Sequence, residues 1–142
     1  MNVSHVGLRV RDMETIKRFY EALGFAQVKQ LMVPDSVAGS LLGLKAPIGF
    51  EAIYLENAGF VLQLLTFAEY PAPEEPERSM VHSGLTHLSI AVDDVAAAQE
   101  AVRAAGGCVI ADPGGGFACM VSDPEGQLVE LINSAVRPVP QR

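Results

Sequence analysis

The sequence contains no cluster of lysine and arginine, and its 17 acidic residues outnumber the 10 basic ones, for a net charge of −7. Binding to nucleic-acid phosphates requires a basic face, so no nucleic-acid partner is expected. No apolar stretch approaches the ~18 to 20 residues needed to cross a bilayer, which argues against a membrane role. Met1 leads into alternating polar residues and not into the apolar run of a signal peptide. We therefore expect a cytoplasmic protein.

Cysteine is also scarce. Cys108 and Cys119 do not have the spacing of a metal or redox motif, and we interpret both as reduced thiols. Hydrophobic residues make up 49% of the chain and charged residues 19%, which is enough apolar material for a core and argues against disorder. The length of 142 residues is within the range of one compact domain.

The most informative feature is an internal repeat. Four residues recur 82 positions later in the same structural roles: His5, Val10, Asp12 and Gly24 return as His87, Val92, Asp94 and Gly106. Repeats of this kind indicate one structural unit used twice.

Each copy begins with a segment around its histidine in which branched apolar residues alternate with polar or small ones, a pattern typical of a half-buried strand. A helix with one apolar face follows. Asp12 and Asp94 are the expected N-caps, because a short side-chain oxygen satisfies an unpaired N–H of the first turn. Gly24 and Gly106 are expected to end the helices in the left-handed conformation.

Three more strands are predicted in each copy, at about 25–33, 50–57 and 59–66 in the first and about 107–111, 116–122 and 127–133 in the second. The unit is therefore β-α-β-β-β, used twice. We predict an α+β fold of two tandem βαβββ modules that form a cupped mixed sheet, with helices on the outer face.

The predicted organisation is a single domain over residues 1–142. Module one covers 1–68 and module two covers 84–133, followed by a C-terminal tail at 134–142. Segment 69–83, rich in proline and glutamate, is expected to be a solvated linker. The first copy alone has a long loop at 34–49, and loops of this length often cover or gate a site.

Four polar side chains stand out on the predicted inner faces. His5 and His87 lie opposite the apolar residues of their strands, while Gln63 and Glu130 interrupt apolar strands. Burying a neutral polar group without a partner costs roughly 2 to 7 kcal/mol, so each needs one. A metal is one candidate, and imidazole with oxygen donors suits Zn, Co, Ni, Mn or Fe. Structural histidines, an arginine partner for Glu130 and a satisfied core amide at Gln63 are the alternatives.

Several segments resemble the vicinal oxygen chelate superfamily, which includes glyoxalase I, methylmalonyl-CoA epimerase, extradiol dioxygenases, fosfomycin-resistance proteins and bleomycin-binding proteins. The resemblance covers about residues 3–133, and its motifs are HVGLRVRD at 5–12, RFYEALGF at 18–25, GLTHLSIAVDD at 84–94 and DPEGQLVEL at 123–131. It implies paired βαβββ modules cupped around one divalent metal ion, and a homodimer.

The resemblance also implies roles for individual residues. By position, His5, Gln63, His87 and Glu130 would be the metal ligands. Glu130 would also be the base that removes a proton next to a carbonyl, because Gln63 is neutral. The metal would stabilise the resulting enolate. Arg9 resembles a glutathione-contacting arginine of some bacterial glyoxalases and would bind an anionic substrate; a surface or ion-paired arginine is the alternative.

Three functions are compatible with this pattern. The first is a metal-dependent isomerase, epimerase or lyase acting on a small oxygenated substrate. The second is an Fe(II) extradiol-type dioxygenase built on His5, His87 and Glu130. Gln63 argues against it, because a ligating Gln63 would fill a coordination position that catechol or O₂ needs. The third is a non-catalytic antibiotic-binding protein, against which the ligand set argues. Segment 112–117 lacks the basic residue that holds glutathione in glyoxalase I, so a glutathione-bound substrate is not expected.

Overall fold

The computed structural model describes residues 2–73, 77–136 and 138. The chain divides into two compact units, Met1–Glu74 and Glu75–Arg142, and the division falls inside the segment rich in proline and glutamate. Most of the predicted tail beyond Val136 lies outside the described residues. Within the described part of the chain, no helix is long and apolar enough to span a membrane.

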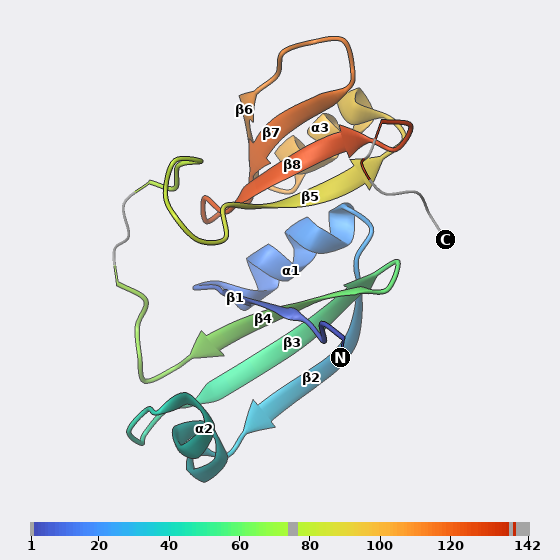
Figure 1. Cartoon of the computed structure of the whole chain (residues 1–142). Helices are drawn as coiled ribbons and strands as arrows, with labels where there is room; N and C mark the ends of the chain where they lie inside the picture. Colours follow the sequence, from blue (N-terminus) through green and yellow to red (C-terminus); the bar gives the residue numbers. More distant parts are fainter. Residues whose placement is uncertain (1, 74–76, 137, 139–142) are drawn as a thin grey trace. The chain divides into compact units, whose positions relative to one another are not determined.

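The first unit contains four strands and two helices (Figure 1). Its elements are β1 (Val6–Arg9), α1 (Met13–Ala22), β2 (Ala26–Val33), α2 (Asp35–Leu42), β3 (Phe50–Asn57) and β4 (Phe60–Phe67). The strands form one sheet in the order β1-β4-β3-β2. Strand β1 is parallel to β4, and the other neighbours are antiparallel.

Over its described residues, the second unit repeats this plan without a counterpart of α2. Its elements are β5 (His87–Val92), α3 (Val95–Ala104), β6 (Cys108–Ala111), β7 (Ala118–Ser122) and β8 (Leu128–Asn133). The strand order is β5-β8-β7-β6, with β5 parallel to β8. The α+β fold class and the duplicated β-α-β-β-β unit are therefore confirmed.

The helix ends follow the sequence signals. Asp12 accepts a hydrogen bond from the backbone N–H of Thr15 at 3.0 Å, and Asp94 accepts one from Ala97 at 3.0 Å. Gly24 and Gly106 follow the helices with φ of 91° and 87°, a region in which an L side chain is strained. The expected N-caps and helix stops are thus confirmed in both copies.

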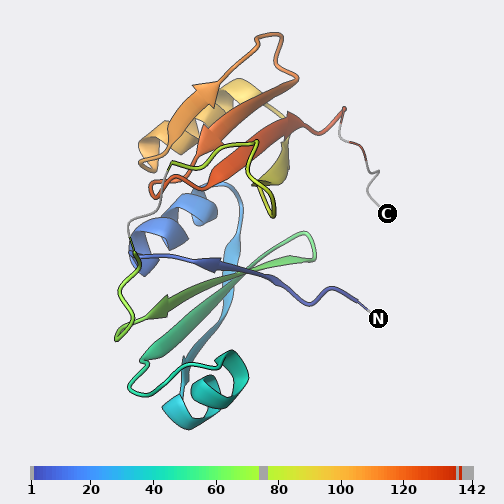
Figure 2. The same cartoon turned by 60° about the vertical axis from the view of Figure 1, so that its left-hand side comes forward.

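One face of each sheet is closed by a helix, α1 on the first and α3 on the second (Figure 1 and Figure 2). The closed face is apolar: Leu62 and Leu64 of β4 and Val129 and Leu131 of β8 are all fully buried. Because side chains alternate along a strand, Gln63 and Glu130 lie on the opposite face of their sheets.

The loop predicted at 34–49 is not a plain loop, because it contains helix α2. Its Ala38 is fully buried and packs with Ile48, Phe50 and Ala52 into a small core. The Asp35 carboxylate accepts hydrogen bonds from the N–H groups of Ile48 and Gly49 at 3.1 and 3.2 Å. The prediction was wrong here because the helix is short and rich in small residues, so tertiary packing and not amphipathic periodicity stabilises it.

The start of the predicted linker is fixed to the first unit. The Tyr70 hydroxyl donates to the carbonyl oxygen of Lys45 at 2.6 Å and accepts from the N–H of the same residue at 3.1 Å. Tyr70 also packs against the small core that contains Ala38. The segment around α2 is therefore tied down from two sides, by Asp35 and by Tyr70.

Candidate metal and substrate site

The first unit brings His5 and Gln63 together around Tyr54. His5 directly precedes β1, and Gln63, only 9% exposed, lies in the middle of β4. The Gln63 Nε2 donates a hydrogen bond to the Tyr54 hydroxyl at 2.8 Å. The His5 ring meets the Tyr54 ring edge-on, with 5.5 Å between the ring centroids. One imidazole and one amide therefore share a single aromatic neighbour.

The second unit brings His87 and Glu130 together directly. The His87 Nε2 lies 4.0 Å from the Glu130 Oε2, and the two side chains are 27% and 30% exposed. Donor atoms that each lie ~2.1 Å from a common ion can be at most ~4.2 Å apart, so this pair fits one ion. The Ser89 hydroxyl donates to the same Glu130 oxygen at 2.5 Å. The pair is thus formed and supported within one unit.

The two pairs occupy equivalent positions of the repeat. In the first sheet Gly7 of β1 lies opposite Gln63 of β4, and in the second Ser89 of β5 lies opposite Glu130 of β8. His5 lies two residues before Gly7, and His87 lies two residues before Ser89. The duplication therefore repeats an imidazole and an oxygen donor, and not merely the fold.

A hydroxyl group contacts each histidine on the same ring nitrogen. The Ser4 Oγ lies 3.1 Å from the Nδ1 of His5, and the Thr86 Oγ1 lies 2.9 Å from the Nδ1 of His87. With Nδ1 engaged, Nε2 is the ring nitrogen that remains for a metal, an arrangement typical of metal-binding histidines. Sequence reasoning missed this contact, although a hydroxyl residue before each histidine is visible in the repeat.

Within the described residues, no group of three His, Cys, Asp or Glu side chains gathers at one point. The composition of the two pairs explains why no such group forms within one unit. Each unit contributes only two of the proposed donors, and the oxygen donor of the first unit is an amide. The prediction that all four donors hold one ion therefore remains a prediction.

Arg9 lies on the same face of the first sheet as Gly7 and Gln63, by strand alternation. Its guanidinium lies over the Phe67 ring, 5.2 Å from the centroid, and donates a hydrogen bond to the backbone carbonyl of Tyr70. Both contacts orient a side chain that is always charged. Arg9 is thus held in a fixed position by an aromatic ring and a carbonyl.

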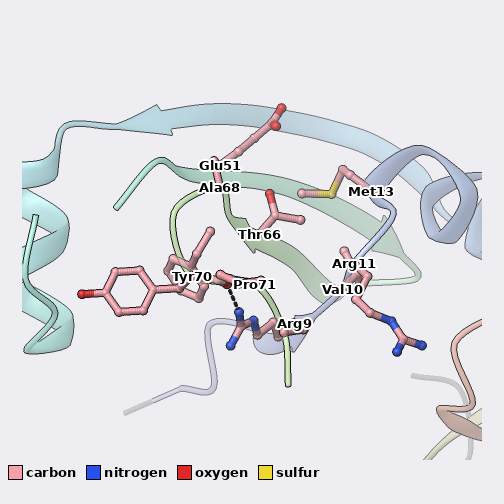
Figure 3. A pocket seen from close by; sticks show the side chains of 11 residues that line it. Arg9, Val10, Arg11, Met13, Glu51, Thr66, Ala68, Tyr70 and Pro71 are labelled. Atoms are coloured by element: carbon pink, nitrogen blue, oxygen red, sulfur yellow. Dashed lines mark hydrogen bonds between the residues drawn. The ribbon is translucent and has the colours of Figure 1, made fainter. Parts of the chain in front are cut away.

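Arg9 lines a cavity of about 550 Å³ within the first unit (Figure 3). Arg11, Met13, Glu51, Thr66 and Pro71 line the same cavity. Figure 3 shows Arg9 directed toward Tyr70 and Arg11 directed away from it. Glu51 already accepts a hydrogen bond from Gln30 at 2.8 Å. The charged side chains that line the cavity are thus Arg9, Arg11 and Glu51.

The segment 112–117 of the second unit carries an acidic group. The Asp112 carboxylate accepts hydrogen bonds from Gln99 and from the N–H of Gly114, both at 2.7 Å. Both bonds lower the pKa of Asp112 below its ordinary value, and the bond from Gln99 has the larger effect. Cys119 nearby is buried, and burial raises the pKa of its thiol. Both groups lie outside the donor pairs described above.

Comparison with known proteins agrees with this architecture. Residues 2–131 match the model of the family described as the Glyoxalase/Bleomycin resistance protein/Dioxygenase superfamily. The chain belongs to this superfamily. A protein of Vibrio cholerae named "Probable lactoylglutathione lyase" is 42% identical over 141 residues, covering 93% of this chain and 90% of that protein.

Plant relatives are longer. The chain is 33% identical to an Arabidopsis thaliana protein named "Probable lactoylglutathione lyase, chloroplastic", and the match covers 96% of this chain but 37% of that protein. The chain therefore spans well under half of the length of this relative. A relative from Brassica oleracea, named "Putative lactoylglutathione lyase", is matched over 45% of its length.

Solved structures share the fold at low identity. A glyoxalase family protein from Bacillus cereus has a TM-score of 0.85 at 16% identity, with 94% of this chain and 93% of that chain covered. Glyoxalase I of Leishmania major has a TM-score of 0.67 at 23% identity, with 91% and 84% covered. The fosfomycin resistance protein FosX of Listeria monocytogenes, solved as a mutant in complex with Mn(II), has a TM-score of 0.64 at 16% identity, with 93% and 91% covered. At these identities the likeness establishes the fold.

Proposed function

We propose that this protein is a divalent-metal-dependent lyase or isomerase of the glyoxalase type, which removes a proton next to a carbonyl of a small oxygenated substrate. The observation that carries the proposal is the pair of equivalent donor sets, each with its histidine Nδ1 next to a hydroxyl. The name of the Vibrio cholerae relative supports the same class of reaction.

The residues fit a divalent ion. His5 and His87 would offer Nε2, Glu130 a carboxylate oxygen and Gln63 its amide oxygen, a mixed nitrogen and oxygen set that suits Zn, Co, Ni, Mn or Fe. The Mn(II) of the Listeria FosX protein, which shares the fold, supports a first-row ion. When bound, the ion would supply Lewis acidity to a substrate carbonyl oxygen. The two units that share it would come from one chain or from two chains of a homodimer.

Glu130 is the base in this proposal. Among the four donors it alone is a carboxylate, since Gln63 is a neutral amide and both imidazoles are committed to the ion. The Ser89 hydroxyl holds one carboxylate oxygen, Oε2, and leaves Oε1 for the transferred proton. With 30% of the side chain exposed, a substrate carbon can approach the carboxylate.

Arg9 would hold an anionic end of the substrate. Its guanidinium is oriented by Phe67 and by the Tyr70 carbonyl, and it lines a cavity whose volume suits a small molecule. The names of the relatives make lactoylglutathione the first compound to test. In glyoxalase I the segment equivalent to 112–117 holds glutathione with a basic residue, whereas this chain has the acidic Asp112 there. Glutathione-free α-hydroxy carbonyl compounds should therefore be tested in parallel.

Metal loading tests the proposal. Protein stripped with a chelator should gain thermal stability from at least one of Co, Ni, Zn, Mn or Fe(II), by about 2.7 kcal/mol at an ion concentration 100 times the dissociation constant. The loaded protein should exchange solvent deuterium into the α-carbon of its substrate. Stability that none of these ions raises would rule the proposal out. Oxygen uptake with catechols in the presence of Fe(II) would support the dioxygenase alternative instead.

A further inference from the structure

Tyr54 lies between the two donors of the first unit. In the sheet it is paired with Gln63 on one side and with Lys29 on the other. Its hydroxyl accepts the Gln63 Nε2 hydrogen bond at 2.8 Å, and its ring meets the His5 ring at an interplanar angle of 84°. Tyr54 is therefore the side chain that contacts both donors.

The hydrogen bond determines which way the Gln63 amide faces. A glutamine amide can ligate a metal through Oε1 only, because Nε2 has two hydrogens and no available lone pair. With Nε2 bound to Tyr54, Oε1 is the atom directed the other way, toward Gly7. A Cβ at Gly7 would stand 3.4 Å from this oxygen, so the missing side chain leaves room around it.

Tyr54 is itself held in place. The Lys29 Nζ lies 5.9 Å from its ring centroid, and the ring packs against the small core formed by Ala38, Ile48, Phe50 and Ala52. Ala38 and Ile48 come from the segment that contains α2, which has no counterpart among the described residues of the second unit. This segment therefore supports the side chain that orients the amide.

The second unit provides a natural comparison. The residue paired with Glu130 at the position equivalent to Tyr54 is Met120, which has no hydrogen-bond donor or acceptor comparable to a phenol. A carboxylate has two equivalent oxygens and ligates in either orientation, so it needs no such partner. The tyrosine thus occurs in the unit whose donor is an amide, and is absent from the equivalent position in the unit whose donor is a carboxylate.

We infer that Tyr54 is a positioning residue of the metal centre: its hydroxyl turns the Gln63 amide so that Oε1 faces the ion, and its ring orients His5. The inference rests on the proposed function, because it takes His5 and Gln63 as ligands. Partners that orient a ligand typically contribute 10- to 100-fold in metal affinity.

The test uses the full chain, stripped of metal and titrated with Co(II). Tyr54→Phe retains the ring and loses the hydroxyl, and should bind Co(II) roughly 10- to 100-fold more weakly, with a changed visible absorption spectrum. Tyr20→Phe is the matched control, since Tyr20 on α1 is buried against Phe19 and Phe25, and α1 is the helix that covers the opposite face of the sheet. It should lower the unfolding midpoint without changing Co(II) affinity.

A rescue variant separates orientation from packing. In Tyr54→Phe/Gln63→Glu the donor is a carboxylate, which ligates without the hydroxyl, so Co(II) affinity should return to within a few-fold of wild type. Equal affinity of Tyr54→Phe and wild type would overturn the inference and leave the proposed function standing. A loss that Gln63→Glu does not rescue would also overturn it. If the wild-type protein binds no Co(II), the proposed function itself fails.

Discussion

At the scale of single residues, the most informative difference between the two copies is at equivalent positions of their last strands. Gln63 and Glu130 hold the same register position in their sheets, yet only Glu130 can carry a negative charge and accept a proton. Its neighbours also differ, because Ser89 donates to Glu130 where the first copy has Gly7. In the proposed mechanism, this asymmetry gives the proton transfer to the second unit and leaves the first unit a neutral oxygen donor.

Glu130→Gln tests this assignment. The amide preserves the size of the side chain and an oxygen donor but cannot accept the proton, so deuterium exchange into the substrate should fall by about 10²- to 10⁴-fold. Circular dichroism should show an unchanged fold. Glu100→Gln, at an exposed carboxylate that pairs with Arg103 on α3, should leave exchange unchanged. Exchange that persists in Glu130→Gln would transfer the role of base to another group.

The equivalent strand positions of His5, Gln63, His87 and Glu130 were predictable from the sequence, because these residues interrupt a simple apolar alternation and recur in a repeat; their role as metal donors remains a proposal. Within each unit the structure brings His5 near Gln63 and His87 near Glu130. Tyr54 was not predicted. It occurs in an ordinary strand pattern, where a tyrosine suits a half-buried position, and only cross-strand pairing shows its contact with Gln63.

At the scale of elements, α2 is the main difference between the copies. The segment 34–49 was predicted as a loop because its glycines and prolines indicate turns, and the helix within it has little amphipathic pattern. The strands and the other two helices were predictable, because alternation and N-caps are local signals. The packing of Ala38 and Ile48 on the sheet is not local, so no short sequence window contains it.

Asp35 should stabilise this segment. Asp35→Ala removes the acceptor of two partly buried N–H groups, those of Ile48 and Gly49, and should lower the free energy of unfolding by about 1 to 3 kcal/mol. Denaturant unfolding measures this. Ser36→Ala, on the exposed side of the same first turn, should change stability by less than about 0.5 kcal/mol. Equal effects of the two variants would mean that the carboxylate does not hold the segment.

The helix caps make a prediction about pH. Hydrogen bonds from the Thr15 N–H and from its hydroxyl lower the pKa of Asp12 below its ordinary value of 3.8. A lowered folded pKa adds stability that is present above about pH 3.8 and is lost as the pH falls through the folded value. Asp12→Asn keeps an acceptor and loses the charge, so its unfolding midpoint should be lower than that of wild type at neutral pH. The difference should shrink as the pH falls below 3.8 and through the lowered folded pKa.

The test of the pH prediction is thermal unfolding of both proteins across that range. Other carboxylates titrate there too, but they do so equally in the two proteins, so only the difference between midpoints counts. A difference that stays constant from neutral pH to about pH 2.5 would show that the charge of Asp12 adds nothing to the cap.

At the scale of the whole molecule, the protein is a pair of similar units, each with two of the four proposed donors. His5 with Gln63 in one and His87 with Glu130 in the other are each too few to hold a divalent ion tightly. Sequence periodicity predicts each sheet, but it contains no information on how two sheets meet. The resemblance to the superfamily, which implies paired modules around one divalent ion, is the basis of the proposal that the two units share an ion.

The measurement that tests this claim most directly is the metal stoichiometry of three purified proteins: wild type, His5→Ala and His87→Ala. Each is dialysed against Co(II), washed and analysed by mass spectrometry for bound cobalt per chain. If one ion takes donors from both units, wild type retains about one ion per site, and either variant, although altered in a different unit, loses it nearly completely. If either variant keeps its cobalt with wild-type affinity, the units do not share an ion and the account is contradicted.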